Sequence, residues 1–234
     1  MKIIATLLIA LLFPLTSFAA LQFDGVDDYV RAGTAYSIVN NFTVSVWMKR
    51  TANFSAADFR MMFSNGADGA NGWAIYLKES SGSHLHSFLK GGAAAENSTI
   101  VNPLNKWEHV LYTVSGSRAR LYINGVLAFT FTDSTAIVAP TPYKFIGADQ
   151  NASGDPQQYF PGLLDDVRVY NRALSATEVR AIYKGNANWK GLVGWWKLQN
   201  PNFAVDISGF GNHGKMVNGV ASTISSPPFS RVRR

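Results

Sequence analysis

The sequence predicts an all-β protein in which two antiparallel sheets pack face to face as a jelly-roll sandwich, with one short connecting helix. Short runs of β-branched and aromatic residues alternate between apolar and polar with a period of two, as half-buried strands do. Gly, Asn, Asp and Ser separate these runs at turns. The chain of 234 residues contains 47% hydrophobic and 13% aromatic residues, which is enough to fill one sizeable core.

Composition and charge exclude several classes of protein. Only 15% of the residues are charged, whereas disordered chains carry more charge and few aromatic residues. There is no cysteine, which excludes disulfides, thiol catalysis and thiolate zinc sites. The formal net charge is +6, but the basic residues are scattered and do not form the stripe typical of nucleic-acid binders. We therefore expect no nucleic-acid partner, and a mild preference for acidic surfaces or polysaccharides.

The first 19 residues have the composition of a secretory signal. A basic start at Lys2 precedes the apolar run Ile3–Leu15, and the small residues Ser17 and Ala19 stand where a signal peptidase cleaves. This run is too short for the ~20 residues of a membrane span, and no later run is long enough. We expect residues 1–19 to be removed and the mature chain to be secreted, extracellular or periplasmic, with no membrane span.

The strands and turns of the middle of the chain are the most explicit. Asn124-Gly125 is the favoured pair for a type I′ hairpin turn, because both residues tolerate a positive φ. A second hairpin connection is expected at 115–118, so that three consecutive strands pair through local turns. The clearest expected strands are 42–48, 72–77, 109–114, 119–123 and 126–131.

One short helix is expected after residue 175. Ser175 suits the N-cap position, and Glu178 stands three residues later, which is the spacing of a capping box. Gly185 ends the helix, whose few turns fit a connection in a two-sheet sandwich. The apolar face consists of Leu174, Val179, Ile182 and Tyr183.

Five sequence blocks together resemble a known family. In chain order they are Leu21–Val30, Phe42–Trp47, Lys106–Val110, Leu121–Val126 and Gly162–Ser175. In these blocks the chain is similar to laminin-G-like domains of the concanavalin A-like lectin/glucanase family. The resemblance implies a jelly-roll sandwich with a concave and a convex sheet. It also implies a secreted binding or adhesion module, and many relatives hold one structural Ca²⁺.

The order of the C-terminal segment departs from the family pattern. Residues 191–198 and 206–214 look like the segment that often precedes the opening strand, although here they follow the helix. We expect residues 20–229 to form one domain, followed by a basic tail at 230–234. Residues 191–229 are expected to complete the sandwich of this domain, as in a circular permutation. Two alternatives remain open. The segment could exchange with a neighbouring molecule, which would give self-association, or it could be the remnant of a second repeat.

Carboxylates are the candidate metal ligands. Period two places Asp165 on the same strand face as three apolar residues, so burial of that face would bury its charge, which then needs a metal ion or several hydrogen bonds. The resemblance suggests Asp24 as its partner, and Ca²⁺ accepts carboxylate and backbone oxygens together. The alternative is that Asp165 only accepts backbone N–H bonds. Asp27 and Asp28 are expected to be exposed turn residues.

Candidate binding residues are aromatic side chains, which stack on sugar faces, and side chains that hydrogen-bond sugar hydroxyls. We expect a glycan or an extracellular protein surface as the ligand. The polar, amide-rich loop 149–159 supplies two of the candidates, although such a loop is as often a plain solvated connection. The competing interpretation of the aromatic residues is core packing. The candidates are Trp73, Tyr76, Arg120, Tyr122, Asn151 and Gln157.

An enzymatic function is not predicted. A glycoside hydrolase needs two carboxylates flanking a groove, and the acids here are isolated in the sequence. The histidines lack metal-ligand spacing on a helix; His84 and His86 alternate on one strand and are expected to be exposed. We therefore assign no catalytic residue and expect a secreted, non-catalytic binding or adhesion module. The alternatives are an architectural subunit that assembles by strand exchange through 191–229, and a glycoside hydrolase or lyase of the same superfamily.

Overall fold

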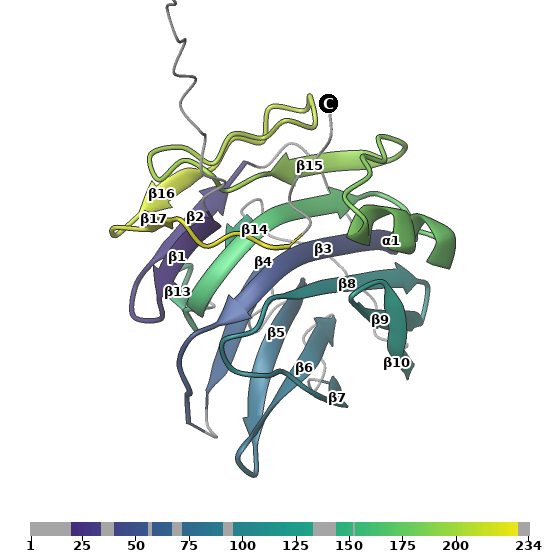
Figure 1. Cartoon of the computed structure of the whole chain (residues 1–234), viewed down its shortest axis with the longest axis horizontal. Helices are drawn as coiled ribbons and strands as arrows, with labels where there is room; N and C mark the ends of the chain where they lie inside the picture. Colours follow the sequence, from purple (N-terminus) through teal and green to yellow (C-terminus); the bar gives the residue numbers. More distant parts are fainter. Residues whose placement is uncertain are drawn as a thin grey trace, which may run out of the picture.

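The computed structural model describes residues 20–33, 40–55, 58–66, 72–90, 96–132, 144–151 and 153–228. The predicted signal and the predicted basic tail lie outside these residues. Within them, two antiparallel sheets pack against each other, and the one helix lies beside the first sheet (Figure 1). The predicted fold class is confirmed. No helix in this part of the chain is long and apolar enough to cross a membrane.

The first sheet has eight strands. Its order is β10-β9-β8-β3-β14-β1-β17, and β15 pairs with the second half of β14, whose first half pairs with β1. The strands are β1 (Ala20–Asp24), β3 (Asn41–Arg50), β8 (Glu108–Ser115), β9 (Arg118–Ile123), β10 (Val126–Thr132), β14 (Pro161–Tyr170), β15 (Leu192–Trp196) and β17 (Ala221–Thr223).

The second sheet has seven strands in the order β16-β2-β11-β4-β5-β6-β7. A separate two-stranded ribbon, β12 (Asp149–Gln150) and β13 (Pro156–Gln157), follows β11. The seven strands are β2 (Tyr29–Ala32), β4 (Phe59–Asn65), β5 (Trp73–Ser80), β6 (Ser83–Lys90), β7 (Glu96–Val101), β11 (Lys144–Ile146) and β16 (Lys215–Val217).

The local predictions for the hairpins and the helix are confirmed. Asn124 and Gly125 have φ of +52° and +78°, and Ile123 pairs with Val126 across the turn. The helix α1 (Ala176–Tyr183) begins after Ser175, whose side chain accepts the Glu178 N–H at 3.3 Å in a complete capping box. Its apolar face packs on the outer face of the first sheet, because Val179 and other residues of α1 share a buried cluster with residues of β8, β9, β14 and β15.

The core between the sheets is built largely from aromatic rings. Trp73 stacks on Phe42 with ring centroids 4.3 Å apart and on Phe63 at 5.4 Å, so it joins the two sheets. Trp196 reaches the same core, 6.2 Å from Phe63, and is fully buried. The preceding Trp195 points to the opposite face of the first sheet, into the cluster beneath α1.

The C-terminal segment adds one strand beside β1 in the first sheet and one beside β2 in the second sheet. β16 pairs with β2, β17 pairs with β1, and β15 pairs with β14, all within one chain. Asp206 fixes the connection after β15 by accepting the N–H groups of Trp195 and Asn212 at 2.9 and 2.8 Å. The pairings of the described strands thus place this segment beside the other strands of the same chain's sandwich.

Candidate functional site

Three carboxylates gather in the turn that connects β1 to β2. Asp24 ends β1, and its Oδ1 accepts the N–H groups of Val26 at 2.8 Å and of Asp27 at 3.3 Å, which folds the turn onto its own side chain. Gly25 has a φ of +80°, and a Cβ there would lie 2.8 Å from the Cβ of Pro161 in β14. Glycine is therefore required where this turn passes β14.

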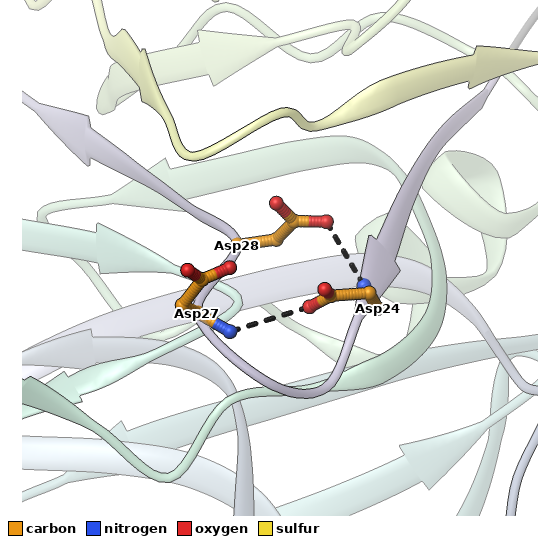
Figure 2. Close-up of side chains that lie close together, drawn as sticks. All are labelled: Asp24, Asp27 and Asp28. Atoms are coloured by element: carbon orange, nitrogen blue, oxygen red, sulfur yellow. Dashed lines mark hydrogen bonds between the residues drawn. The ribbon is translucent and has the colours of Figure 1, made fainter.

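The three acidic side chains of this turn lie close enough to share one cation. Asp24, Asp27 and Asp28 each contribute an oxygen, and these oxygens lie within 4.8 Å of one another (Figure 2). Asp28 Oδ2 accepts the Asp24 N–H at 3.0 Å, whereas the buried Oδ1 finds no hydrogen-bond partner among the described residues. We call these three residues the acidic turn.

Burial of Asp28 sets the electrostatics of the acidic turn. Asp27 is exposed, as expected, but the same expectation for Asp28 is wrong, because only 5% of it is accessible. Burial raises the pKa of the Asp28 carboxyl; the Asp24 N–H lowers it, and the charges of Asp24 and Asp27 raise it further. A cation would relieve both the repulsion and the unpartnered oxygen.

The donor set of the acidic turn fits Ca²⁺. Carboxylate oxygens are the hard ligands that this ion takes, and the remaining positions of its six to eight go to backbone oxygens or water. Asp24 and Asp27 face solvent, so an ion has access. The turn is also held from the C-terminal segment, because the Asn218 side chain donates to the Asp27 carbonyl at 3.1 Å.

The structure does not bring Asp165 to Asp24. In the β1–β14 pairing Asp24 lies opposite Pro161 and Leu21 opposite Leu164, so Asp165 stands beyond the far end of the paired stretch. Asp165 is buried as expected, with 1% exposed; its Oδ1 accepts the Asp166 N–H at 2.7 Å. Burial raises its pKa well above the ordinary value. The register of β1 against β14 separates Asp24 from Asp165, and this is the physical reason why the predicted pair is not one site.

The neighbouring Asp166 forms a buried ion pair that the sequence analysis missed. Arg168 donates to both its carboxylate oxygens, at 3.0 and 2.7 Å, and Trp195 Nε1 donates at 2.6 Å. The Arg168 guanidinium also lies 4.3 Å from the Trp195 ring centroid. These contacts tie β15 to β14. The two-residue spacing of Asp166 and Arg168 on one strand was the available signal.

Three of the predicted ligand residues are interior residues. Trp73 is fully buried between the sheets, Tyr76 packs with Met61, and α1 covers Tyr122. Their exposed fractions are 0%, 1% and 6%. The alternation along each strand correctly indicates opposite faces, but the structure covers both faces, so these rings pack the interior and offer no platform for a sugar.

The other predicted ligand residues are partly exposed and belong to different elements of the structure. Asn151 closes its own loop, because its Oδ1 accepts the N–H groups of Ser153 at 3.0 Å and of Asp155 at 2.8 Å. Gln157 pairs with Asp149 in the β12–β13 ribbon. Arg120 belongs to β9 of the first sheet, where it pairs with neighbouring strands. Loop 149–159 is therefore a self-supporting ribbon.

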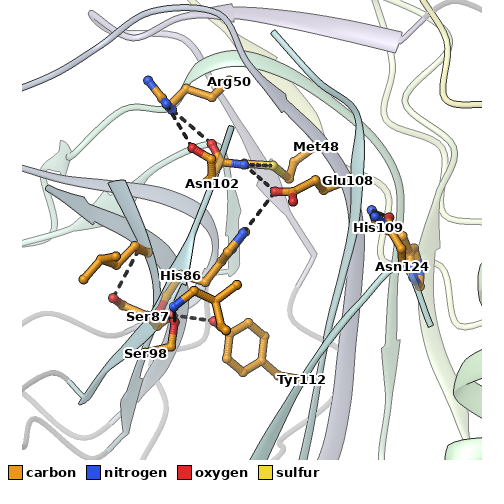
Figure 3. Close-up of polar contacts among 12 residues, drawn as sticks. Met48, Arg50, His86, Ser87, Ser98, Asn102, Glu108, His109, Tyr112 and Asn124 are labelled. Atoms are coloured by element: carbon orange, nitrogen blue, oxygen red, sulfur yellow. Dashed lines mark hydrogen bonds and ion pairs between the residues drawn. The ribbon is translucent and has the colours of Figure 1, made fainter. Parts of the chain in front are cut away.

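His86 belongs to a buried polar network at one end of the core. Its Nε2 lies 3.1 Å from Glu108 Oε2, which also accepts the Asn102 side chain at 2.5 Å (Figure 3). Arg50 donates to Asn102 Oδ1 at 3.0 Å. His84 is buried too, with 6% exposed, so the expectation of an exposed histidine pair is wrong. The network pairs His86 Nε2, Asn102 and Arg50, whereas the buried His86 Nδ1 has no hydrogen-bond partner among the described residues.

A family model identifies the group of proteins to which the chain is related. The model for concanavalin A-like lectins/glucanases, Laminin_G_3, matches residues 24–180. This chain belongs to the concanavalin A-like lectin/glucanase superfamily. The match begins at the acidic turn and ends within α1. The recognised resemblance is therefore confirmed, and the C-terminal strands of this superfamily member lie outside the matched residues.

Relatives and solved structures of similar fold carry varied names. The zebrafish (Danio rerio) adhesion G-protein coupled receptor V1 is 28% identical over 158 residues, which are 62% of this chain but 2% of the receptor. A putative carbohydrate binding protein from Bacteroides ovatus matches with a TM-score of 0.71 and 16% identity, over 94% of this chain and 63% of that one. Domain 4 of the Geobacillus stearothermophilus arabinanase AbnA, in complex with arabinotriose, matches with a TM-score of 0.51 and 22% identity. This match covers 70% of this chain and 76% of that one.

Proposed function

We propose that this superfamily member is a secreted, non-catalytic binding module that recognises glycan or extracellular protein surfaces, with a Ca²⁺ ion in the acidic turn. The observation that carries the proposal is the family match over residues 24–180, which covers most of a sandwich. The names of two similar structures, a putative carbohydrate binding protein and an arabinanase domain in complex with arabinotriose, support a glycan as the first ligand class to test.

The state of the carboxylates supports a non-catalytic role. General acid and base catalysis needs two carboxylates with free access to a glycosidic bond. Glu108 is held in the buried network, and Arg172 clamps Glu178 through two hydrogen bonds of 3.0 and 2.6 Å. Asp166 and Asp206 are likewise occupied by structural donors. Catalysis by any of these four would require breaking a contact that holds the fold together.

The proposed role of Ca²⁺ is structural. When bound, the ion supplies positive charge and coordination positions that join Asp24, Asp27 and Asp28. Asp24 shapes the turn through its own backbone contacts, Asp28 supplies the unpartnered buried oxygen, and Asn218 links the turn to the C-terminal segment. The residues thus hold the β1–β2 connection and the end of the chain in one arrangement.

A glycan array screened in Ca²⁺ and in chelator tests the proposal. We expect retention on at least one class of glycan, weaker retention in chelator, and the same weakening in Asp28→Asn without chelator. Asp58→Asn is the matched control, because Asp58 is a partly exposed carboxylate paired with Arg60, thirty residues or more from the acidic turn in sequence. Release of reducing sugar from a bound polysaccharide would overturn the non-catalytic role, and silence on every glycan would overturn the choice of ligand class.

A further inference from the structure

Trp189 differs from the other tryptophans of the chain in being exposed. The chain has six tryptophans, and all lie among the described residues. Trp107 is half-buried and four others are buried, whereas 59% of Trp189 is accessible. A single exposed apolar residue needs no explanation by itself. Two properties of its surroundings decide whether Trp189 can bind a ligand: contacts that hold the ring in place, and polar or charged groups beside it.

Trp189 lies in the loop between α1 and β15, and contacts of its ring and of its two neighbours hold the indole in position. The ring packs edge-on against Trp195, with centroids 5.3 Å apart. On one side, the Asn188 side chain donates to Glu178 at 3.2 Å. On the other, Arg172 Nε donates to the Lys190 carbonyl at 2.9 Å. An aromatic ring that is already ordered costs little entropy when a ligand binds to it.

The chain around Trp189 is basic and has no acidic residue. Residues 179–205 contain four cationic side chains and no Asp or Glu. None of the four forms an ion pair with any residue that the structure describes. Lys190 adjoins the ring and is exposed, and Lys197 Nζ lies 5.6 Å from the Trp195 ring that Trp189 contacts. The four cations are Arg180, Lys184, Lys190 and Lys197.

The acids that approach this region from other elements do not cancel its charge. Arg172 neutralises Glu178 through two hydrogen bonds, and Arg168 neutralises Asp166 in the same way. Asp165, whose charge would act on Lys197, has a pKa that burial raises well above its ordinary value. Asp206, which accepts the Trp195 N–H at 2.9 Å, has no cation partner among the described residues, but it is one carboxylate against four cations. The region beside the exposed indole therefore keeps a net positive charge.

We propose that Trp189, Lys190 and Lys197 form a subsite for a polysaccharide that carries carboxylate or sulfate groups. The indole offers a flat apolar face to the C–H face of a sugar ring. The two ammonium groups offer charge-assisted hydrogen bonds to an acidic substituent. This inference rests on the proposed glycan binding and names the ligand class, which neither the family match nor the names of the similar structures assign.

Affinity electrophoresis of the full chain through gels that contain dextran, dextran sulfate or polygalacturonate tests this subsite. Dextran and dextran sulfate differ only in charge, and polygalacturonate distinguishes carboxylate from sulfate recognition. We expect retardation by one or both acidic polymers, weakened by added salt because screening reduces attraction between exposed charges. Trp189→Ala should weaken the retardation about tenfold, the factor that loss of one aromatic stacking contact brings. Lys190→Glu with Lys197→Glu should abolish it.

Phe203→Ala is the matched control, because Phe203 is 63% exposed in the connection after β15. We expect this variant to bind like the wild type, and we expect Trp189→Ala and the charge-reversal variant to melt near the wild-type temperature. Equal loss in Trp189→Ala and Phe203→Ala, or equal retardation by dextran and dextran sulfate, would overturn the subsite. Binding of neutral glycans that does not depend on Trp189 would overturn the subsite while leaving the proposed function intact. The absence of binding to any glycan would instead overturn the choice of glycans as the ligand class, on which the subsite rests.

Discussion

Two pairs of consecutive aspartates look alike in the sequence and are used in opposite ways. Asp165-Asp166 lies in the middle of the first sheet, where one carboxyl has a raised pKa and the other is neutralised by Arg168. Asp27-Asp28 lies in the turn that connects β1 to β2, where Asp24 adds a third carboxylate and no described cation pairs with them. The first pair is closed by the protein, and the second is open to an ion.

The difference between the two pairs shows which features of a buried carboxylate indicate a ligand site. Burial alone does not, because Asp165 is more deeply buried than Asp28. An unpartnered buried oxygen does not distinguish them either, because both Asp28 Oδ1 and Asp165 Oδ2 lack a partner among the described residues. What distinguishes the acidic turn is access from solvent together with two further carboxylates within 4.8 Å. The closed pair stabilises the fold, and the open turn is the place where binding an external ion can stabilise it.

The largest expected effect is on the closed pair. Arg168→Met leaves Asp166 buried without its counter-charge, and we expect the free energy of unfolding to fall by about 3–5 kcal/mol. Urea denaturation monitored by tryptophan fluorescence measures this loss. The double variant with Asp166→Asn should recover most of the stability, because no unpaired charge then remains. Failure of the second substitution to restore stability would show that the pair is not the source of the loss.

A smaller effect is expected when the open turn is loaded. At a Ca²⁺ concentration of about 100 times the dissociation constant, the wild type should gain about 2.7 kcal/mol of stability, visible as a rise in melting temperature. Asp28→Asn should lose this gain, while Asp58→Asn, at a partly exposed ion pair, should keep it. If Ca²⁺ raises the melting temperature of Asp28→Asn as much as that of the wild type, the acidic turn is not the Ca²⁺ site.

The pH dependence of stability gives a further test of the region around the Asp166–Arg168 pair. His109 is fully buried near Asp166 and Arg168, and burial lowers its pKa to about 3. Between pH 3 and pH 6.5 the unfolded chain binds a proton on this histidine that the folded chain does not, so stability falls as the pH falls through this window. At pH 5 the loss is about 2 kcal/mol. Denaturation curves of the wild type and His109→Gln should differ in slope against pH, and parallel slopes would contradict the assignment.

The smallest expected effect lies outside both aspartate pairs. Ser175→Ala removes the N-cap of α1 and should cost about 1 kcal/mol, because one backbone N–H loses its acceptor. Chemical denaturation of this variant gives the scale on which the loss at Arg168 is judged. If the cap cost as much as the buried ion pair, burial would not be what makes the closed pair strong.

Local features could be predicted from the sequence because their causes lie within a few residues. The Asn124-Gly125 turn and the Ser175–Glu178 capping box depend on backbone preferences and on spacing along the chain. The family resemblance could also be recognised because its blocks follow one another in the family's order. These features account for the fold class, the central hairpins and the helix.

The candidate site could be predicted only in part, because burial depends on residues far away in the sequence. Strand alternation placed Trp73 and Tyr76 on opposite faces, but it could not show that both faces are covered. Asp28 is buried although the sequence of its turn is typical of an exposed one. Asn218, which donates to the carbonyl of the neighbouring Asp27, comes almost two hundred residues later in the chain. Trp189 offered a signal, the stretch of 27 residues without an acid at 179–205, that was available from composition alone.

Titration of Ca²⁺ into the metal-free chain by calorimetry tests the comparison between the two aspartate pairs most directly. Wild type, Asp28→Asn and Asp165→Asn are measured side by side; Asn at 165 keeps the acceptor that the Asp166 N–H uses. The account predicts one site in the wild type and in Asp165→Asn, and none in Asp28→Asn. A site that persists in Asp28→Asn and disappears in Asp165→Asn would contradict it.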